Sequence, residues 1–529
     1  KMGASRLGDH SRSPRRSCRS DGPRAFLQGQ AVQFFHEADP ASLDTPYVCP
    51  WEGAGCRNPR VLQSHGWIDG RLHEAFHEES FDIDDPSSWP HVEPVMGVAF
   101  SGRGPNEHSA STTGPMRVLP HLMREPSDKS PLLSVVFVRQ GSEFIIEHQG
   151  RYSCPPSDLY MSSMVGLGVK AHPLLMGDTS DVRFDFEIFS VFVECSEDLA
   201  QLASMAPRLA ARLQGIHKTA FWMLWPTEWE DCGGTDLGYV EKGALFSAMR
   251  ACEAAGVSSG FPHPADQYEL ITSKSWMATL SLDPKARLPA AVMVTTETAL
   301  RDPMHAAKQA LTDLECIRHQ NPRAPAEWKV SSVNEHRITK GVVKLGWSWE
   351  AKDVLQFSGE EQLRDRMMEL LTQTGCTASA CLVQEWVDFD FEMRLFFFPP
   401  TKWVSTQRLQ PARVECTAWS EPCGEGRPRG FHMLSEERCL SRWDQDRDAF
   451  QSAKEQSVEI SQHLLGWLFA VDCRPIPMIR LDFMVRRLGS GKAFVTFGEF
   501  CEAGGEIFGW KDGCPTMWRA ALDHVLSRA

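Results

Sequence analysis

Three carboxylates gather around one predicted β-hairpin in the C-terminal part of the chain. Two apolar runs, residues 478–485 and 493–497, flank a Gly-Ser-Gly turn, a pattern typical of two paired strands. Asp482 interrupts the first run, and Glu499 and Glu502 follow the second. Carboxylates that converge beside apolar surface repel one another unless a cation lies among them. Hard oxygen ligands suit Mg²⁺ that is shared with phosphates, so the pattern predicts a magnesium site. The alternative is ordinary edge-strand acids that face water.

Two predicted strands carry an arginine beside an acid. Alternate side chains of a strand share a face, so Arg480 points the same way as Asp482, and Arg394 points the same way as Glu392. Charges on a buried strand need partners. These residues therefore either serve a site or form structural salt bridges, and the sequence leaves both open.

Two lysines are candidates for holding an anion. Lys344 ends the predicted strand 339–344, where its ammonium can act as a point charge on phosphate oxygens, with Lys340 as the second choice. Lys274 follows Ser273, which we expect to cap the start of a helix. The alternative for Lys274 is a solvated lysine, which is the usual state of this residue type.

The order of these motifs resembles the ATP-grasp superfamily. Along the chain come Ser273-Lys274, the segments 342–346 (VVKLG) and 383–387 (VQEWV), Glu392-Met393-Arg394, and then the hairpin. The resemblance covers roughly residues 216–529. It implies an α+β fold in which a two-lobe unit clamps ATP, preceded by a small α/β pre-domain. The strand and helix patterns before residue 216 predict in addition an N-terminal α+β module.

The resemblance also implies roles for individual residues. Nucleotide contacts fall on Lys274, Lys344, Gln384, Glu385, Trp386, Val387 and Glu392. The lysines would reach the phosphates, the backbone of residues 384–387 would pair with the adenine edge, and Glu385 would take the ribose hydroxyls. The loop after Lys344 is poorer in glycine than the phosphate-covering loop of the family.

The metal ligands and the catalytic arginines follow in the same way. Mg²⁺ is implied on Asp482 and Glu499. Cys501 stands where the family carries Asn, and because sulfur is a poor magnesium ligand, Glu502 is the expected substitute. Arg480 and Arg394 would stabilise the phosphoryl group during its transfer.

The function implied is an ADP-forming ligase that uses ATP and Mg²⁺. ATP would phosphorylate a small-molecule or peptide carboxylate, and an amine or thiol would then displace the phosphate. The alternatives are an ATP-binding assembly factor and a pseudoenzyme, neither with ligase turnover.

Composition narrows the class of protein. The 529 residues carry a net charge of −14 and are 42% hydrophobic, which is ordinary for a globular protein. An acidic chain is a poor general binder of nucleic acid or anionic membrane, and no apolar run approaches the roughly 20 residues of a membrane helix. The 16 cysteines are scattered and no signal peptide is visible, so we expect reduced thiols and a cytoplasmic location.

The predicted organisation has five parts. They are a basic tail (1–30), an irregular segment (31–130), a small α+β domain (131–215), a pre-ATP-grasp domain (216–295) and an ATP-grasp-like domain (296–529). Cys49, Cys56, His65 and His73 could form a zinc site, but their spacing differs from that of a zinc finger, and we prefer incidental residues in a loop-rich segment.

Overall fold

The computed structural model describes the chain in a series of ranges. These are residues 118–122, 130–140, 164, 168, 172–176, 186–193, 195–230, 238–320, 337–347, 353–419, 431–504, 510 and 512–527. The residues considered for a zinc site, Cys49, Cys56, His65 and His73, lie outside these ranges. The predicted tail and most of the loop that follows Lys344 also lie outside them. Within the described ranges, no helix has the length and apolar character needed to cross a bilayer.

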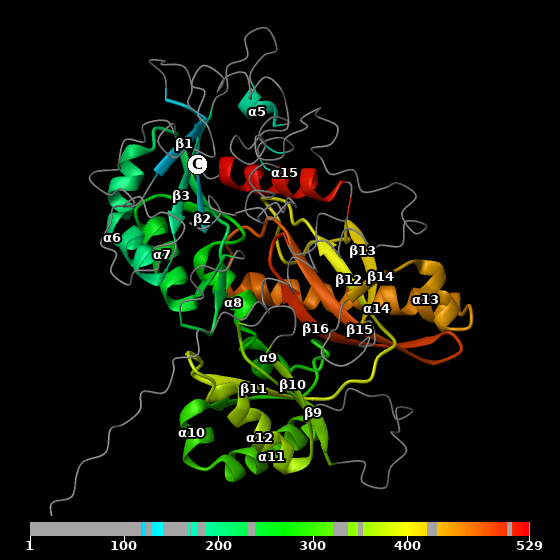
Figure 1. Cartoon of the computed structure of the whole chain (residues 1–529). Helices are drawn as coiled ribbons and strands as arrows, with labels where there is room; N and C mark the ends of the chain where they lie inside the picture. The colour runs from blue at the N-terminus through cyan, green and yellow to red at the C-terminus, as the bar shows by residue number, and fades with distance from the viewer. Residues whose placement is uncertain are drawn as a thin grey trace, which may run out of the picture.

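The first sheet has five strands and is mostly parallel. Its strand order is β1 (Val118–Leu122), β3 (Phe186–Val193), β2 (Leu133–Gln140), β4 (His217–Trp222) and β7 (Ser258–Phe261). Helices α6 (Ser196–Arg212) and α7 (Lys242–Ala254) cover one face, and α15 (Gly513–Leu526) covers the other (Figure 1). Side chains alternate across β2: Val136 and Val138 pack in the same core as α6 and α7, while Val135 and Phe137 pack in the core that contains α15. A short helix, α5 (Pro173–Met176), also belongs to this part of the chain.

This sheet joins residues that the sequence assigns to two domains. Strand β2 belongs to the predicted 131–215 domain and β4 to the predicted 216–295 domain, yet they are hydrogen-bonded neighbours with Val136 opposite Ala220. The predicted boundary therefore lies inside one sheet. The sequence indicates the individual strands but not which strands pair. Parallel neighbours are joined by a long crossover, here through β3 and α6, so no turn motif between them marks the pairing.

The second sheet has four antiparallel strands. They run in the order β10 (Val354–Ser358), β9 (Lys340–Lys344), β11 (Ala380–Glu385) and β8 (Ala291–Thr295). Its core includes residues of three helices, α10 (Thr296–Arg301), α11 (Pro303–Gln320) and α12 (Gly359–Leu371). Val343 and Val383 pack into that helical core, whereas Leu382 packs into the core of the third sheet. One face of the second sheet thus looks toward the third.

The third sheet contains the predicted hairpin. Its strand order is β14 (Phe431–Leu434), β13 (Arg413–Trp419), β12 (Phe391–Phe397), β15 (Ile479–Gly489) and β16 (Lys492–Cys501), all antiparallel. Helix α14 (Arg447–Val471) packs on its apolar face, where Leu464 and Leu468 share a core with Leu395 and Phe483. The hairpin is confirmed, and its strands continue past the apolar runs because ladder hydrogen bonds do not depend on side-chain type.

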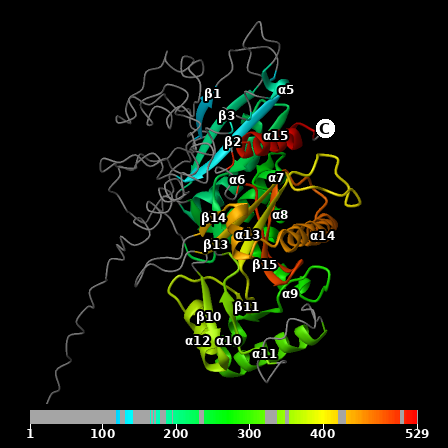
Figure 2. The ribbon, with the colours of Figure 1, turned by 90° about the vertical axis from the view of Figure 1, so that its right-hand side faces the viewer.

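Smaller elements link the three sheets. They are β5 (Trp225–Thr227), β6 (Tyr239–Glu241), α8 (Ala265–Ser273), α9 (Trp276–Leu280) and α13 (Glu436–Arg442). In side view the first sheet lies at one end, the helices of the second sheet lie at the other, and the third sheet lies between them (Figure 2). The fold is mixed α/β; its described residues form one mainly parallel sheet, two antiparallel sheets and a two-stranded parallel sheet of β5 and β6.

Candidate functional site

One face of the third sheet is charged where the other is apolar. In its register Arg394 lies opposite Asp482, Asp482 lies opposite Glu499, and Arg480 lies opposite Cys501. Their neighbours along the strands pack under α14, so strand alternation places all five side chains on the face away from that helix.

A bulge at Gly498 brings Glu499 onto this charged face. Asp482 pairs with Glu499 but the next residue, Phe483, pairs with Phe497, so Gly498 is left without an opposite residue. Without the bulge, Glu499 would share the apolar face of Phe497. A Cβ at position 498 would lie 3.1 Å from the Asp482 carbonyl oxygen, which favours glycine there.

Asp482 is held by a buried ion pair with Arg480. Arg480 donates from Nε to Oδ1 and from Nη2 to Oδ2, both at 2.8 Å. The Cys501 thiol donates to Oδ2 at 3.7 Å, and Arg394 Nε lies 3.8 Å from the same oxygen. Asp482 is only 4% exposed and Arg480 only 5%. A bidentate pair of this kind fixes both side chains.

Arg480 also contacts the sulfur of Cys501. Its Nη2 donates to Sγ at 2.9 Å. Burial opposes the charge of Arg480, but the negative charge of Asp482 and the hydrogen bonds to it raise the pKa of the guanidinium well above its usual value. Burial raises the pKa of the Cys501 thiol well above its ordinary value, more than Arg480 lowers it. At neutral pH the sulfur therefore keeps its proton, which agrees with its donation to Asp482.

Two lysines approach the acidic residues of this face from outside the third sheet. Lys274 Nζ lies 3.9 Å from Glu499 Oε2. Lys344 ends β9 on the face turned toward the third sheet; burial and the positive charge of Lys274 lower its pKa to about 8, against the raising effect of Glu499. A Cβ at Gly346 would lie 2.6 Å from the Ser273 carbonyl oxygen, so this glycine lets the chain after Lys344 approach the end of α8.

The local setting of Lys274 differs from the prediction. Ser273 does not cap the start of a helix: it is the last residue of α8, and its Oγ donates to the Leu270 carbonyl at 3.1 Å. Lys274 follows it in the left-handed conformation, with φ of 56°. The sequence pattern does not distinguish a serine that ends one short helix from a serine that precedes the next. In the structure it is Ser275 that precedes α9.

The segment predicted to bind adenine connects the second and third sheets. Gln384 is 5% exposed, and among the described residues its Nε2 has no hydrogen-bond partner. The Trp386 backbone N–H donates to the Lys340 carbonyl at 3.1 Å, and Lys340 Nζ lies 3.9 Å from the centre of the Trp386 ring. Val387 is half-buried between β11 and β12.

Glu385 and Glu392 both have partners within the protein. Glu385 Oε1 accepts from the Ala290 backbone N–H at 2.8 Å, and Oε2 accepts from Arg318 at 2.6 Å. These contacts fix the position of the Glu385 side chain, and the ribose contact that the resemblance implies for it stays a prediction. Glu392 accepts from Arg394 at 3.2 Å and from Thr417 at 3.3 Å. Burial raises the pKa of Glu392, Arg394 lowers it, and the nearby acids raise it further.

The donor set for a metal differs from the predicted one. Among the described residues, Asp482, Glu499 and Cys501 offer ligand atoms within 4.8 Å of one another, and Glu502 is not part of this group. Strand β16 ends at Cys501, and Glu502 is buried, which raises its pKa to about 7. The sequence analysis excluded Cys501 because sulfur is a poor ligand for Mg²⁺. Its spacing of two residues from Glu499 was nevertheless a signal that both side chains lie on one face of the strand.

This donor set does not fit Mg²⁺. Both oxygens of Asp482 accept hydrogen bonds from Arg480, and the third donor is a protonated sulfur, whereas Mg²⁺ binds oxygen in a near-octahedral arrangement. Of the two carboxylates in this set, only Glu499 has no arginine within 4 Å among the described residues. Its side chain is 38% exposed.

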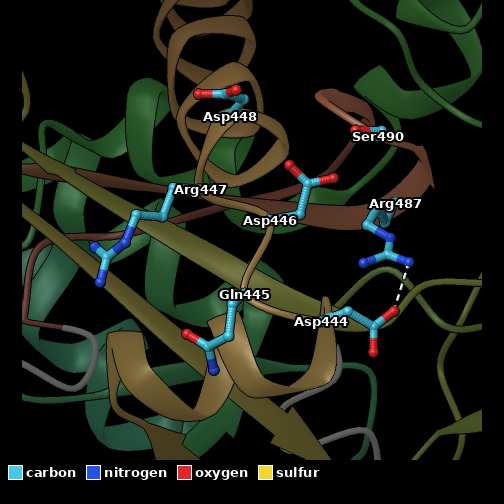
Figure 3. Close-up of a pocket in the computed structure, with 7 residues that line it drawn as sticks. All are labelled: Asp444, Gln445, Asp446, Arg447, Asp448, Arg487 and Ser490. Atoms are coloured by element: carbon cyan, nitrogen blue, oxygen red, sulfur yellow. Dashed lines mark hydrogen bonds and ion pairs between the residues drawn. The ribbon is translucent and has the colours of Figure 1, made fainter.

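A surface recess of about 470 Å³ lies elsewhere, at the tip of the hairpin. It is lined by Asp444, Gln445, Asp446, Arg447, Asp448, Arg487 and Ser490 (Figure 3). Asp444 pairs with Arg487 at 2.7 Å, and Asp446 accepts from the backbone of Ala449 and Gly491. These contacts cap α14 and fasten the hairpin turn to it. The recess is separate from the charged face, which lies toward the other end of β15.

Comparison with known proteins finds similarity in three-dimensional structure but not in sequence. No family model and no curated protein matches the sequence. Among solved structures, the chain is similar to D-cycloserine synthetase DcsG, with 14% identity and a TM-score of 0.40 over 74% of this chain and 100% of that one. It is also similar to VanG D-Ala:D-Ser ligase from Enterococcus faecalis, with 12% identity and a TM-score of 0.41 over 75% of this chain and 100% of that one. D-alanine–D-alanine ligase from Bacillus anthracis gives 10% identity and a TM-score of 0.38 over 74% and 96%.

These structural neighbours are ATP-grasp enzymes, the superfamily that the order of motifs resembles. At such identities and TM-scores, what this chain does has to be inferred from its own residues.

Proposed function

We propose that the chain binds ATP between the second and third sheets and acts as an ADP-forming ligase. The observation that carries the proposal is the convergence of Lys274 and Lys344 on Glu499, with Arg394 and Arg480 on the adjoining strands. Four cations gathered between two lobes suit a polyanion such as a nucleotide triphosphate. Gln384, near the end of β11, and Val387, in the connection to β12, would contact the base.

In the proposed reaction an oxygen of the acceptor carboxylate attacks the γ-phosphorus of ATP. The bond from that phosphorus to the β–γ bridging oxygen breaks, which gives an acyl phosphate and ADP. An amine or thiol then attacks the acyl carbon, loses its proton, and releases inorganic phosphate. Lys274 and Lys344 would hold the phosphates, while Arg394 and Arg480 would stabilise charge on the transferring group. No step is assigned to Mg²⁺, because the donor set does not fit it.

ATP binding without ligase turnover is the second candidate. The observation that favours it is the closed Arg480–Asp482 pair, which leaves Glu499 as the main carboxylate available to a ligand. The two candidates differ in one measurement, which is ADP release in the presence of carboxylate and amine mixtures. Release that depends on an acceptor supports the ligase, and tight ATP binding without release supports the assembly factor.

Replacing Lys344 by Ala is expected to weaken ATP binding by ~1.5–3 kcal/mol, the usual scale for a lost charge-assisted contact. Isothermal titration calorimetry measures this. Lys274→Ala should cause a smaller loss, because its side chain is already near Glu499. A matched control is Lys308→Ala, whose side chain is 57% exposed on the far side of the second sheet near Glu360. Equal affinity of the Lys344→Ala variant and the wild type would remove Lys344 from the site.

ATP binding is also expected to weaken as the pH rises from 7 to 9. The pKa of Lys344 is lowered to about 8, so its charge is mostly present at pH 7 and mostly lost at pH 9. Affinity should fall roughly tenfold across this window if the neutral amine contributes nothing. In the Lys344→Arg variant the charge persists, since arginine stays protonated, and this part of the pH dependence should disappear. Identical pH profiles for the two proteins would contradict the assignment.

A further inference from the structure

We propose that Arg480 takes the electrostatic place of a divalent cation in this site, so that nucleotide binding does not require a metal ion. The inference rests on the proposed nucleotide binding. It concerns which group supplies the positive charge next to Asp482 and Glu499.

The guanidinium of Arg480 contacts two of the candidate metal ligands. Of the three described residues that could hold an ion together, two, Asp482 and Cys501, are contacted by Arg480. Three hydrogen bonds from one guanidinium, at 2.8, 2.8 and 2.9 Å, point at those two side chains. A metal ion would have to displace them. The guanidinium is thus already where an ion would neutralise these ligands.

The side chains around Asp482 and Glu499 balance one another's charges. A cluster of carboxylates needs an added cation when acids outnumber the bases around them. Here Arg480 and Arg394 both contact Asp482, and Arg394 also contacts Glu392. Lys274 lies near Glu499. Lys344 adds a fourth positive charge close to Glu499. Glu502, which also interacts with Arg480 and Lys274, is the fourth acid. Among the described residues of this cluster the four cations therefore match the four acids before any metal binds.

Opening the Arg480–Asp482 pair would cost free energy. A metal, including a thiophilic one that accepts sulfur, would bind only after Arg480 leaves Asp482. Arg480 is 5% exposed, and displacing a buried guanidinium from its carboxylate leaves an uncompensated charge, which is strongly unfavourable. The arrangement therefore favours the arginine over a metal.

The test is a calorimetric titration of ATP into the full chain, in EDTA and separately in Mg²⁺, Mn²⁺ and Zn²⁺. We expect a Kd in EDTA within threefold of the Kd in each metal. Binding that is at least thirtyfold tighter in Mg²⁺ than in EDTA would overturn the inference and leave the proposed function intact, and so would a strong preference for Mn²⁺ or Zn²⁺. Absence of ATP binding in every buffer would refute the proposed function itself, and the inference with it.

A double variant isolates the arginine without leaving a lone buried charge. Arg480→Gln combined with Asp482→Asn removes both members of the pair, and we expect at least tenfold weaker ATP binding in EDTA. The control is Arg486→Gln, which removes the same charge from the same strand where the side chain is 39% exposed and lies 3.8 Å from Asp388. Unchanged affinity of a folded double variant would contradict the role of Arg480. Where that variant fails to fold, the wild-type comparison of EDTA with metals decides.

Discussion

Replacing Asp482 by Asn is expected to destabilise the ligand-free protein by about 3–5 kcal/mol, the usual cost of breaking a buried ion pair. The substitution would leave Arg480 and Arg394 facing a neutral amide that accepts fewer hydrogen bonds. By contrast, Glu499→Gln should change stability by less than about 1 kcal/mol, because Glu499 is 38% exposed and its nearest lysine is 3.9 Å away. Thermal and denaturant unfolding of the two variants measure the difference.

The sign of this result discriminates between two views of the hairpin. Had the acids formed an open metal site, removing one would relieve repulsion, and the ligand-free protein would be equally or more stable. A stabilised Asp482→Asn variant would therefore restore the metal site predicted from the sequence. Asp444→Asn is a suitable control, because Asp444 pairs with Arg487 at a distance of 2.7 Å but is 82% exposed. Its effect should be within about 0.5 kcal/mol.

A fragment of residues 216–529 is expected to be insoluble or molten. The sequence alone predicts a domain boundary just before residue 216, and a fragment that begins at a true boundary would fold independently. In the structure, its first strand β4 pairs with β2 on one side, so the fragment would lose β1, β2 and β3 and expose a sheet edge. The apolar surfaces of α7 and α15 that pack on the missing strands would be uncovered as well.

Soluble yield, near-ultraviolet circular dichroism and binding of a hydrophobic dye report on this loss of packing. The matched control is a fragment of residues 118–529, which keeps the whole first sheet and should remain soluble. A monomeric 216–529 fragment with a cooperative thermal transition would show that the first sheet is not a single folding unit.

Local patterns predicted much of the third sheet. The hairpin follows from two apolar runs around a glycine-rich turn, and the shared face of Arg480 and Asp482 follows from strand alternation. Lys344 is found, as predicted, at the end of a strand. These features depend on residues close in sequence, which is why a single chain reveals them.

Features that depend on pairing between distant segments were missed. The bulge at Gly498 changes which face Glu499 occupies, and only the register with β15 reveals it; a glycine inside a strand was the available signal. The same register brings Cys501 beside Arg480 and Asp482 in place of Glu502. The parallel pairing of β2 with β4 likewise left no local trace.

Helix α15 has a consequence for how the protein is made. Trp518 of this helix stacks on Phe221 of β4 with ring centres 5.9 Å apart, and lies 5.1 Å from Phe261 of β7. The ribosome completes those strands more than 200 residues before it reaches α15, as the element order shows. Throughout that interval the nascent chain carries a sheet with one uncovered apolar face. Since such surfaces promote aggregation, we expect the first sheet to reach its native packing only after residue 526 has been translated.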